Sequence, residues 1–144
     1  MSVPKIVIHT DVFIEHLAGN SSPSLLRQAM GKFFCYASVF HAIELFSMTR
    51  TETERKAVED MMAAMKVLGL NPKNAPRYGQ LVASHPRKNR NLLLIAGLCL
   101  ESRLPILTDR RGDFKGITGL VCVPTVSLGH KHSGMEILSA AQRG

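Results

Sequence analysis

The sequence contains no tryptophan, and its phenylalanines and tyrosines make up only 6% of the 144 residues. It also has no long hydrophobic run, because the longest one, residues 92–100, has about half the length that a bilayer-spanning helix needs. At the N-terminus, Lys5 precedes only a short apolar run, which differs from the charged-then-apolar layout of a secretory signal. We therefore expect a cytoplasmic protein without a membrane segment.

Cysteine is also scarce, and the three that are present, Cys35, Cys99 and Cys122, lie far apart in apolar segments. An odd number of cysteines without a Cys-x-x-Cys pair indicates neither a zinc site nor redox chemistry. We expect all three to be small buried hydrophobic side chains.

Acidic residues are outnumbered by basic ones: 11 Asp and Glu stand against 18 Lys and Arg, which gives a formal net charge of +7. Such a charge favours polyanionic partners, chiefly nucleic acid, although a solvated positive surface gives the same composition. Because few aromatic residues accompany the basic ones, base stacking of the single-strand-binding kind is not indicated. A hydrophobic content of 45% and this length fit one globular domain.

Short apolar runs alternate with segments of helical spacing along most of the chain. The runs predict strands over residues 4–9, 33–37, 105–107 and 120–124. The other segments predict helices over residues 11–18, 23–30, 39–46, 51–69 and 91–102, with a shorter helix between the turn at 71–76 and residue 84. Alternation of this kind favours an α/β fold with a parallel sheet covered on both faces.

The end of the chain differs from the rest. Residues 1–126 carry the alternating pattern and are expected to form the domain, whereas residues 127–144 look like a polar tail with one candidate amphipathic helix at 135–141. Methionines recur at helical spacing between residues 57 and 68, and this stripe predicts either core packing or a dimer face.

Polar residues follow three of the predicted strands directly. They are His9-Thr10-Asp11, Ser38 and Thr108-Asp109. Because the carboxyl ends of parallel strands lie along one edge of a sheet, these residues are expected to border a common cleft. The acids that could gather there are Asp11, Glu44, Asp109 and Asp113. Several carboxylates at one edge suggest a divalent ion such as Mg²⁺ or Mn²⁺, while a structural salt bridge would also explain Glu44.

Four segments of the chain, in order and at the right spacing, resemble the motifs of PIN domains, most closely the toxin ribonucleases of the VapC type. They are His9-Thr10-Asp11-Val12-Phe13-Ile14-Glu15; Ser38 with Glu44-Leu45 six residues later; Ile95-Ala96-Gly97; and Pro105-Ile106-Leu107-Thr108 followed by Asp113-Phe114. The resemblance covers residues 4–124. It implies a three-layer α/β/α sandwich with a small central parallel sheet, a Mg- or Mn-dependent phosphodiesterase site, RNA as the substrate, a protein antitoxin as a partner and a homodimer.

Carried over residue by residue, the metal site of the family is largely lost. Its first aspartate falls on His9, and only its glutamate is kept, as Glu44. The third acid falls on Leu92, next to Asn91, and the fourth falls on Arg110, next to Asp109. Thr10 and Asp11 match the positions beside the first aspartate, and the remaining supporting positions are Ser38, Thr108 and Asp113.

Two interpretations of this departure stay open. In the first, Asp11, Glu44 and Asp109 bind the ion as catalytic residues, and Asn91 and His9 complete the ligand shell. A one-residue offset on a helix turns a side chain by about 100°, which argues against Asn91. In the second, Arg110 takes over the electrostatic role of the ion, and the protein binds RNA or an antitoxin without cleaving RNA. The sequence therefore leaves open whether the protein is an enzyme.

Basic residues cluster in two loops that should flank the same cleft, at the start of the helix at 91–102 and after the strand at 105–107. They are Arg87, Lys88, Arg90, Arg110, Arg111 and Lys115. We expect them either to contact RNA phosphates or to form a solvated basic face.

Overall fold

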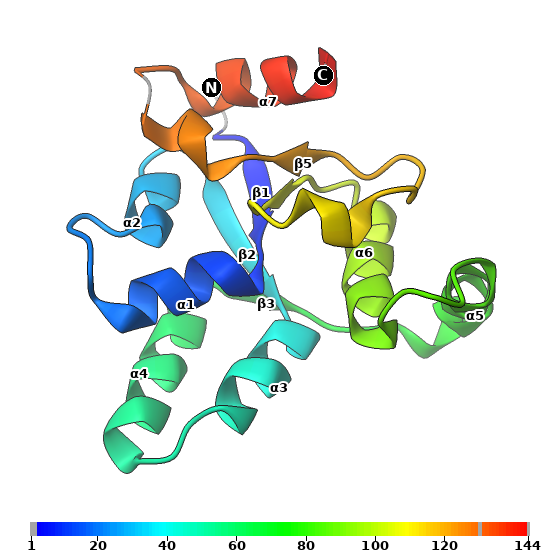
Figure 1. Ribbon diagram of the computed structural model, residues 1–144, viewed down its shortest axis with the longest axis horizontal. Coiled ribbons are helices and arrows are strands. Elements are labelled where there is room, and N and C mark those ends of the chain that lie inside the picture. The colour runs from blue at the N-terminus through cyan, green and yellow to red at the C-terminus, as the bar shows by residue number, and fades with distance from the viewer. Residues whose placement is uncertain (1–2, 130, 144) are drawn as a thin grey trace.

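The computed structural model describes residues 3–129 and 131–143 and contains a five-stranded sheet (Figure 1). All the strand pairs are parallel, and the order across the sheet is β3-β2-β1-β4-β5. The strands are β1 (Lys5–Ile8), β2 (Phe34–Ser38), β3 (Lys66–Leu68), β4 (Ile106–Leu107) and β5 (Cys122–Val123). The small parallel sheet expected from the sequence is confirmed.

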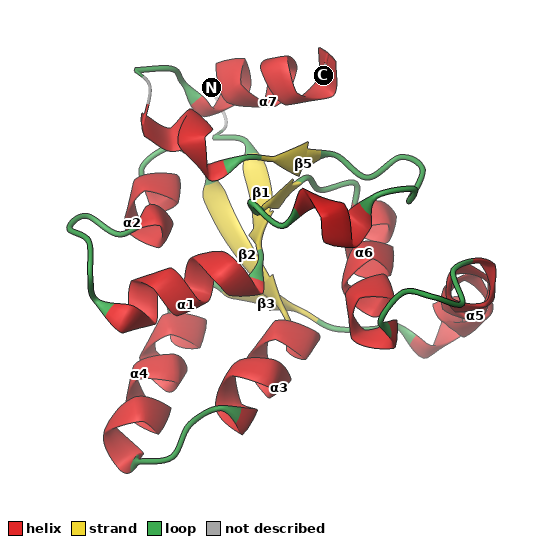
Figure 2. Cartoon of the chain, in the orientation of Figure 1, coloured by secondary structure: helices red, strands yellow, loops and turns green. Residues whose placement is uncertain are grey.

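Helices cover both faces of this sheet, as Figure 2 shows with helices in red and strands in yellow. They are α1 (Thr10–Ala18), α2 (Leu25–Met30), α3 (Val39–Ser47), α4 (Glu52–Ala63), α5 (Ala75–Ser84), α6 (Arg90–Ser102) and α7 (Gly134–Arg143). Three 3₁₀ helices connect them, η1 (Pro72–Asn74), η2 (Arg111–Phe114) and η3 (Thr125–Gly129). The predicted three-layer α/β/α sandwich is confirmed.

The core consists of two hydrophobic clusters because β1 is buried on both faces. Ile6 and Ile8 face the cluster that contains side chains of α1, α2, α4 and α7. Val7 faces the other cluster, which contains the apolar side of α6. Alternate side chains of a strand point to opposite faces, so a strand covered on both sides is apolar at every position.

The predicted helix over residues 51–69 is wrong in its last third. Helix α4 ends at Ala63, and the edge strand β3 follows it. Residues 66–68 pair with residues 36–38 of β2 in parallel register. Apolar residues at positions 65 and 68 fit a helix or a strand, and pairing with β2 decides between the two. The methionines at 61 and 62 are buried in the first core cluster, so the packing interpretation holds for them.

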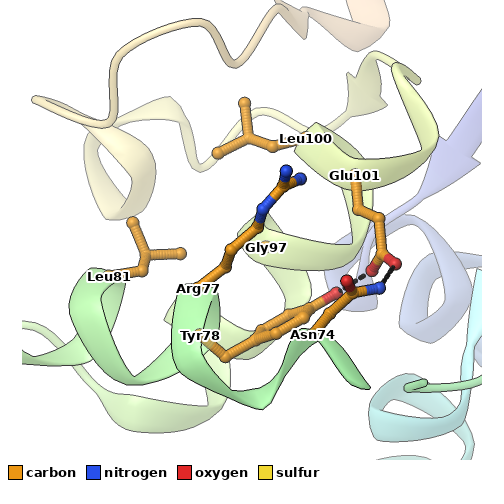
Figure 3. A pocket seen from close by; sticks show the side chains of 7 residues that line it. All are labelled: Asn74, Arg77, Tyr78, Leu81, Gly97, Leu100 and Glu101. Atoms are coloured by element: carbon orange, nitrogen blue, oxygen red, sulfur yellow. Dashed lines mark hydrogen bonds between the residues drawn. The ribbon is translucent and has the colours of Figure 1, made fainter. Parts of the chain in front are cut away.

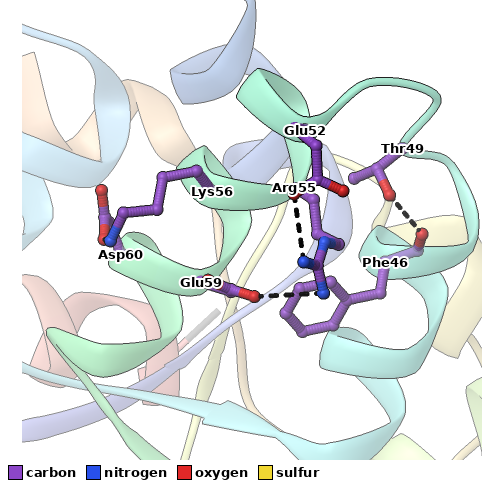
Figure 4. Close-up of polar contacts among 7 residues, drawn as sticks. All are labelled: Phe46, Thr49, Glu52, Arg55, Lys56, Glu59 and Asp60. Atoms are coloured by element: carbon purple, nitrogen blue, oxygen red, sulfur yellow. Dashed lines mark hydrogen bonds and ion pairs between the residues drawn. The ribbon is translucent and has the colours of Figure 1, made fainter.

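Helix α4 carries mostly polar side chains, and local contacts favour its formation. Thr51 caps its N-terminus, and the side chains of Thr51 and Glu54 form a capping box. Its outer face carries ion pairs at helical spacing, which Figure 4 shows. Arg55 pairs with both Glu52 and Glu59 there. These pairs are exposed, so they belong to a solvated surface rather than to a site.

The last part of the chain packs on the rest of the fold. The predicted amphipathic segment forms α7, in which Ile137 is 4% exposed and belongs to the first core cluster. Gly134 begins this helix, and a Cβ atom there would overlap the carbonyl oxygen of Lys32. Residues 130 and 144 lie outside the described residues. The proposed division between residues 1–126 and 127–144 stays a prediction.

Each helix in residues 3–129 and 131–143 is too short or too polar for a membrane span.

Candidate functional site at the carboxyl edge of the sheet

The polar residues at the ends of β1, β2 and β4 lie along one edge of the sheet, as their positions in the sequence predict. His9 and Ser38 are each 1% exposed, and Thr108 is fully buried. Parallel pairing of β1 with β2 and with β4 aligns these strand ends. Buried polar groups need hydrogen-bond partners, so their partners determine what this edge can do.

A chain of hydrogen bonds links the polar residues at the ends of β1 and β2. The backbone N–H of Ser38 donates to Nδ1 of His41, 3.1 Å away, so this nitrogen is an acceptor. The proton of neutral His41 therefore lies on Nε2, which is 3.0 Å from Nδ1 of His9 and donates to it. His9, at the position of the family's first aspartate, is thus held as a neutral imidazole.

The surroundings of both rings keep them uncharged. Burial lowers the pKa of His9 below its ordinary value, and the nearby carboxylates of Asp11 and Glu44 oppose this only in part. Burial also lowers the pKa of His41 well below its ordinary value, and His9 lowers it further. A neutral ring whose Nδ1 already accepts a hydrogen bond has no ligand atom free on that side.

The carboxylate of Asp11 forms hydrogen bonds within the protein. It accepts a hydrogen bond from the Thr108 hydroxyl at 3.0 Å and from the backbone N–H of Asp109 at 2.9 Å. The Thr108 hydroxyl in turn accepts from the N–H of Arg110. These contacts join the start of α1 to the end of β4, so Asp11 has a structural role.

Asp109 is engaged in the same way on the far side of β4. Its carboxylate accepts hydrogen bonds from the backbone N–H of Thr125, at 2.9 Å, and from the Thr125 hydroxyl. This pair ties the end of β4 to the start of η3. Sequence reasoning did not single out Thr125, although it follows the last strand just as the other polar residues follow theirs.

A small hollow of about 160 Å³ opens on the other side of the edge. Its lining comes from the start of α1, from α3, from the start of α6 and from the loop after β4: His9, Thr10, Glu44, Asn89, Asn91, Leu92, Arg110 and Asp113. Of the four predicted acids, Glu44 and Asp113 line this hollow. Asp11 and Asp109 belong to the network described above and do not line it.

The charged groups of the hollow pair with neighbours. The one-residue offset on the helix was expected to turn the Asn91 side chain away from Glu44. Its amide nevertheless donates to Oε2 of Glu44 at 3.3 Å. Arg110 forms an ion pair with Asp113, with 3.2 Å between Nε and Oδ2, rather than with Glu44. The Thr10 hydroxyl is buried and has no hydrogen-bond partner among the described residues.

These residues do not fit a resident divalent ion. Mg²⁺ requires near-octahedral oxygen coordination, and protein sites usually supply carboxylates for it. Within residues 3–129 and 131–143 there is no group of three or more His, Cys, Asp or Glu side chains placed to hold a metal. The guanidinium of Arg110 adds a positive charge to the hollow instead.

Of the predicted basic residues, Arg110 lines this hollow, and Arg111 lines a separate pocket beside β5. Lys88 donates from Nζ to the backbone oxygen of Asp113 at 3.1 Å, which ties the first basic loop to η2. Asn89, between Lys88 and Arg90, caps α6 by accepting from the N–H groups of residues 91 and 92 and also lines the hollow. We call Lys88 and the remaining predicted basic residues the basic rim. The remaining ones are exposed: Arg87, Arg90, Arg110, Arg111 and Lys115.

His41 is the other member of the edge that sequence reasoning missed. Its signal is the spacing Ser-x-x-His, in which the side chain of the third helical residue bonds back to the N-cap, as it does here with Ser38.

No protein-family model matches the chain, and no curated protein matches it. Solved structures do match it. The DNA-bound VapBC of Salmonella typhimurium has a TM-score of 0.72 and 20% identity, over 85% of this chain and 98% of that one. VapBC-1 of nontypeable Haemophilus influenzae has a TM-score of 0.69 and 20% identity, over the same shares. VapBC2 of Rickettsia felis, bound to a promoter DNA fragment, has a TM-score of 0.69 and 16% identity, over 83% of this chain and 98% of that one. The resemblance to VapC-type PIN domains is confirmed at the level of the fold.

Proposed function

We propose that this chain of VapC-like fold binds RNA along the basic rim of the carboxyl edge and does not cleave it through a divalent-metal site. One observation carries the proposal. The carboxylates of Asp11 and Asp109 are bonded to donors of the protein, so they do not join Glu44 in the hollow. The second interpretation of the sequence is therefore favoured.

The distribution of charge supports binding at the rim rather than inside the hollow. Glu44 and Asp113 line the hollow, and their carboxylates would repel a phosphate group. The exposed Arg87, Arg90 and Arg111 are not among its lining residues and lie before α6, at its start and in η2. Phosphate contacts from Lys and Arg provide affinity without reading sequence, and the net charge of +7 adds to the attraction.

Fluorescence anisotropy of a labelled RNA, measured over a series of salt concentrations, tests the rim. We expect the triple variant Arg87→Gln, Arg90→Gln, Arg111→Gln to bind more weakly and to lower the salt slope by about one for each lost phosphate contact. A matched control removes three exposed charges outside the rim, by Arg27→Gln, Arg50→Gln and Lys66→Gln. Equal weakening by the control would reject the rim as the binding surface.

The ribonuclease implied by the family resemblance is the competing function, with Asp11, Glu44, Asp109 and Asn91 as ligands of Mg²⁺ or Mn²⁺. We expect millimolar Mn²⁺ to leave the melting temperature unchanged, and Glu44→Gln to leave any RNA cleavage at its background level. If Mn²⁺ raises the melting temperature and Glu44→Gln abolishes cleavage, the protein is a metal-dependent ribonuclease.

A protein partner such as an antitoxin is a second candidate, because the solved structures above are VapBC complexes. Ile14 and Leu17 lie three residues apart on one face of α1 and are 40% and 36% exposed. We propose that this face contacts such a partner, and Ile14→Glu should abolish co-purification with it. Copurification of the variant at the wild-type level would reject the face. The homodimer stays a prediction that light scattering checks.

A further inference from the structure

A second pocket, of about 210 Å³, lies between α5 and the C-terminal half of α6 (Figure 3). Leu81 of α5 lines it together with Gly97 and Leu100 of α6. The residues at the carboxyl edge take no part in it, and neither the RNA interface nor the family motifs account for its charged groups.

Gly97 allows α5 to approach α6 closely here. A Cβ atom at this position would overlap the ring of Tyr78, which is 6% exposed. The Tyr78 hydroxyl donates to Oε2 of Glu101 at 2.5 Å, and the Asn74 amide donates to Oε1. Burial and the hydrogen bond to Glu101 raise the pKa of Tyr78, so its hydroxyl stays protonated and remains a donor. The carboxylate of Glu101 is therefore held in one position.

Arg77 supplies a positive charge at the same pocket. Figure 3 shows its side chain extending from α5 toward α6, and both Arg77 and Glu101 line the pocket. Its guanidinium makes no hydrogen bond or ion pair with any residue that the structure describes. Opposite charges thus lie at one apolar pocket without pairing with each other.

We propose that this pocket binds an α-amino acid with an apolar side chain. Its carboxylate would pair with Arg77, whose planar fork suits a carboxylate. Its ammonium group would donate to Glu101, because a carboxylate has about four acceptor sites and only two are used here. The apolar side chain would then lie between Leu81 and Leu100.

The size of the pocket supports a ligand of this class. Pockets for drug-sized ligands have volumes of about 300–1,000 Å³, so 210 Å³ suits a smaller molecule. A ligand that carries one charge of each sign leaves neither Arg77 nor Glu101 unpaired in the complex. An uncharged ligand would leave both without a partner of opposite charge.

Saturation-transfer NMR and calorimetry on the full chain test the proposal, with L-phenylalanine as the probe. L-phenylalanine amide lacks the carboxylate, and N-acetyl-L-phenylalanine lacks the ammonium group. We expect saturation transfer to L-phenylalanine at millimolar concentration, and an affinity about tenfold lower for either analogue, a factor that corresponds to about 1.4 kcal/mol. Equal binding of either analogue, or no transfer to L-phenylalanine, would overturn the proposal.

Two variants locate the ligand. Arg77→Gln should weaken binding of L-phenylalanine by about tenfold or more while the protein stays folded, because Arg77 has no partner to lose. Arg27→Gln removes the same charge from α2, on the other face of the sheet, and should bind as the wild type does. Unchanged binding by Arg77→Gln, or equal losses in the two variants, would place the ligand elsewhere and overturn the proposal.

Discussion

The carboxyl edge of the sheet and the pocket between α5 and α6 both contain acidic and basic side chains, but they use them differently. At the edge, Asp11 and Asp109 bond to the protein, and Arg110 pairs with Asp113. At the pocket, Arg77 has no partner among the described residues. A charge that is bonded within the chain stabilises the fold and is not free for a ligand. An unpaired charge contributes little to stability and can bind one.

This difference has a direct consequence for mutations. Substitutions at the edge should act mainly on the free energy of unfolding, whereas charge substitutions at the pocket should act mainly on ligand binding. Four measurements test the comparison.

The largest effect is expected for Asp11→Ala. The variant leaves the buried Thr108 hydroxyl and the N–H of Asp109 without their acceptor, which should cost about 3 kcal/mol of unfolding free energy in urea. Glu59→Ala removes an acid from the exposed face of α4 and serves as the control, with an expected change below about 0.5 kcal/mol. If the Asp11→Ala protein were more stable than the wild type, the carboxylate would destabilise the fold and its role would be functional instead of structural.

Gly97→Ala comes next and perturbs the pocket through its packing rather than through its charges. The added Cβ would displace the Tyr78 ring, at a cost of about 2 kcal/mol, typical of overpacking. Gly79→Ala, on α5, places a Cβ in open space and is the matched control. If both variants unfold at the same urea concentration, the close approach of α5 to α6 does not depend on Gly97.

Low pH should lower the free energy of unfolding through the two buried histidines at the edge, His9 and His41. Burial lowers the pKa of His9 and His41 below their ordinary value of 6.5, so the native state binds fewer protons than the unfolded state. The contribution of these two histidines to stability is then constant well above pH 6.5 and falls as the pH drops below it, by up to about 1.4 kcal/mol per pH unit for each histidine. Urea unfolding between pH 7.5 and pH 5 measures this slope, and a flat profile would contradict the neutral pair.

The smallest effect is expected for Arg110→Ala. Its side chain is 62% exposed, and its ion pair with Asp113 should be worth less than about 1 kcal/mol. In double-mutant cycles, we expect coupling between Arg110 and Asp113 and less between Arg110 and Glu44. The reverse order would favour the guanidinium as a direct partner of Glu44, as the family comparison suggested.

Much of the fold could be predicted because its signals are local. The run at residues 6–8 is apolar at every position, as a strand segment buried on both faces must be. Ser38 and Asn89 begin α3 and α6 with hydrogen bonds that span three residues or fewer. Strand β3 was missed because three half-exposed residues at a sheet edge have no such signal, and only their pairing with β2 defines them.

The sequence by itself determined the alternation of strands and helices, and with it the edge where His9, Ser38 and Thr108 meet. The tertiary structure alone decided what the acids at that edge do. The partners of Asp11 lie 97 and 98 residues away along the chain, and His41 contacts His9 across 32 residues. Spacing and capping act over a few residues, whereas a carboxylate bonds to whichever donor the folded chain brings nearest. The resemblance therefore indicated the fold, whereas the hydrogen-bond partners of Asp11 and Asp109 became known only from the tertiary structure.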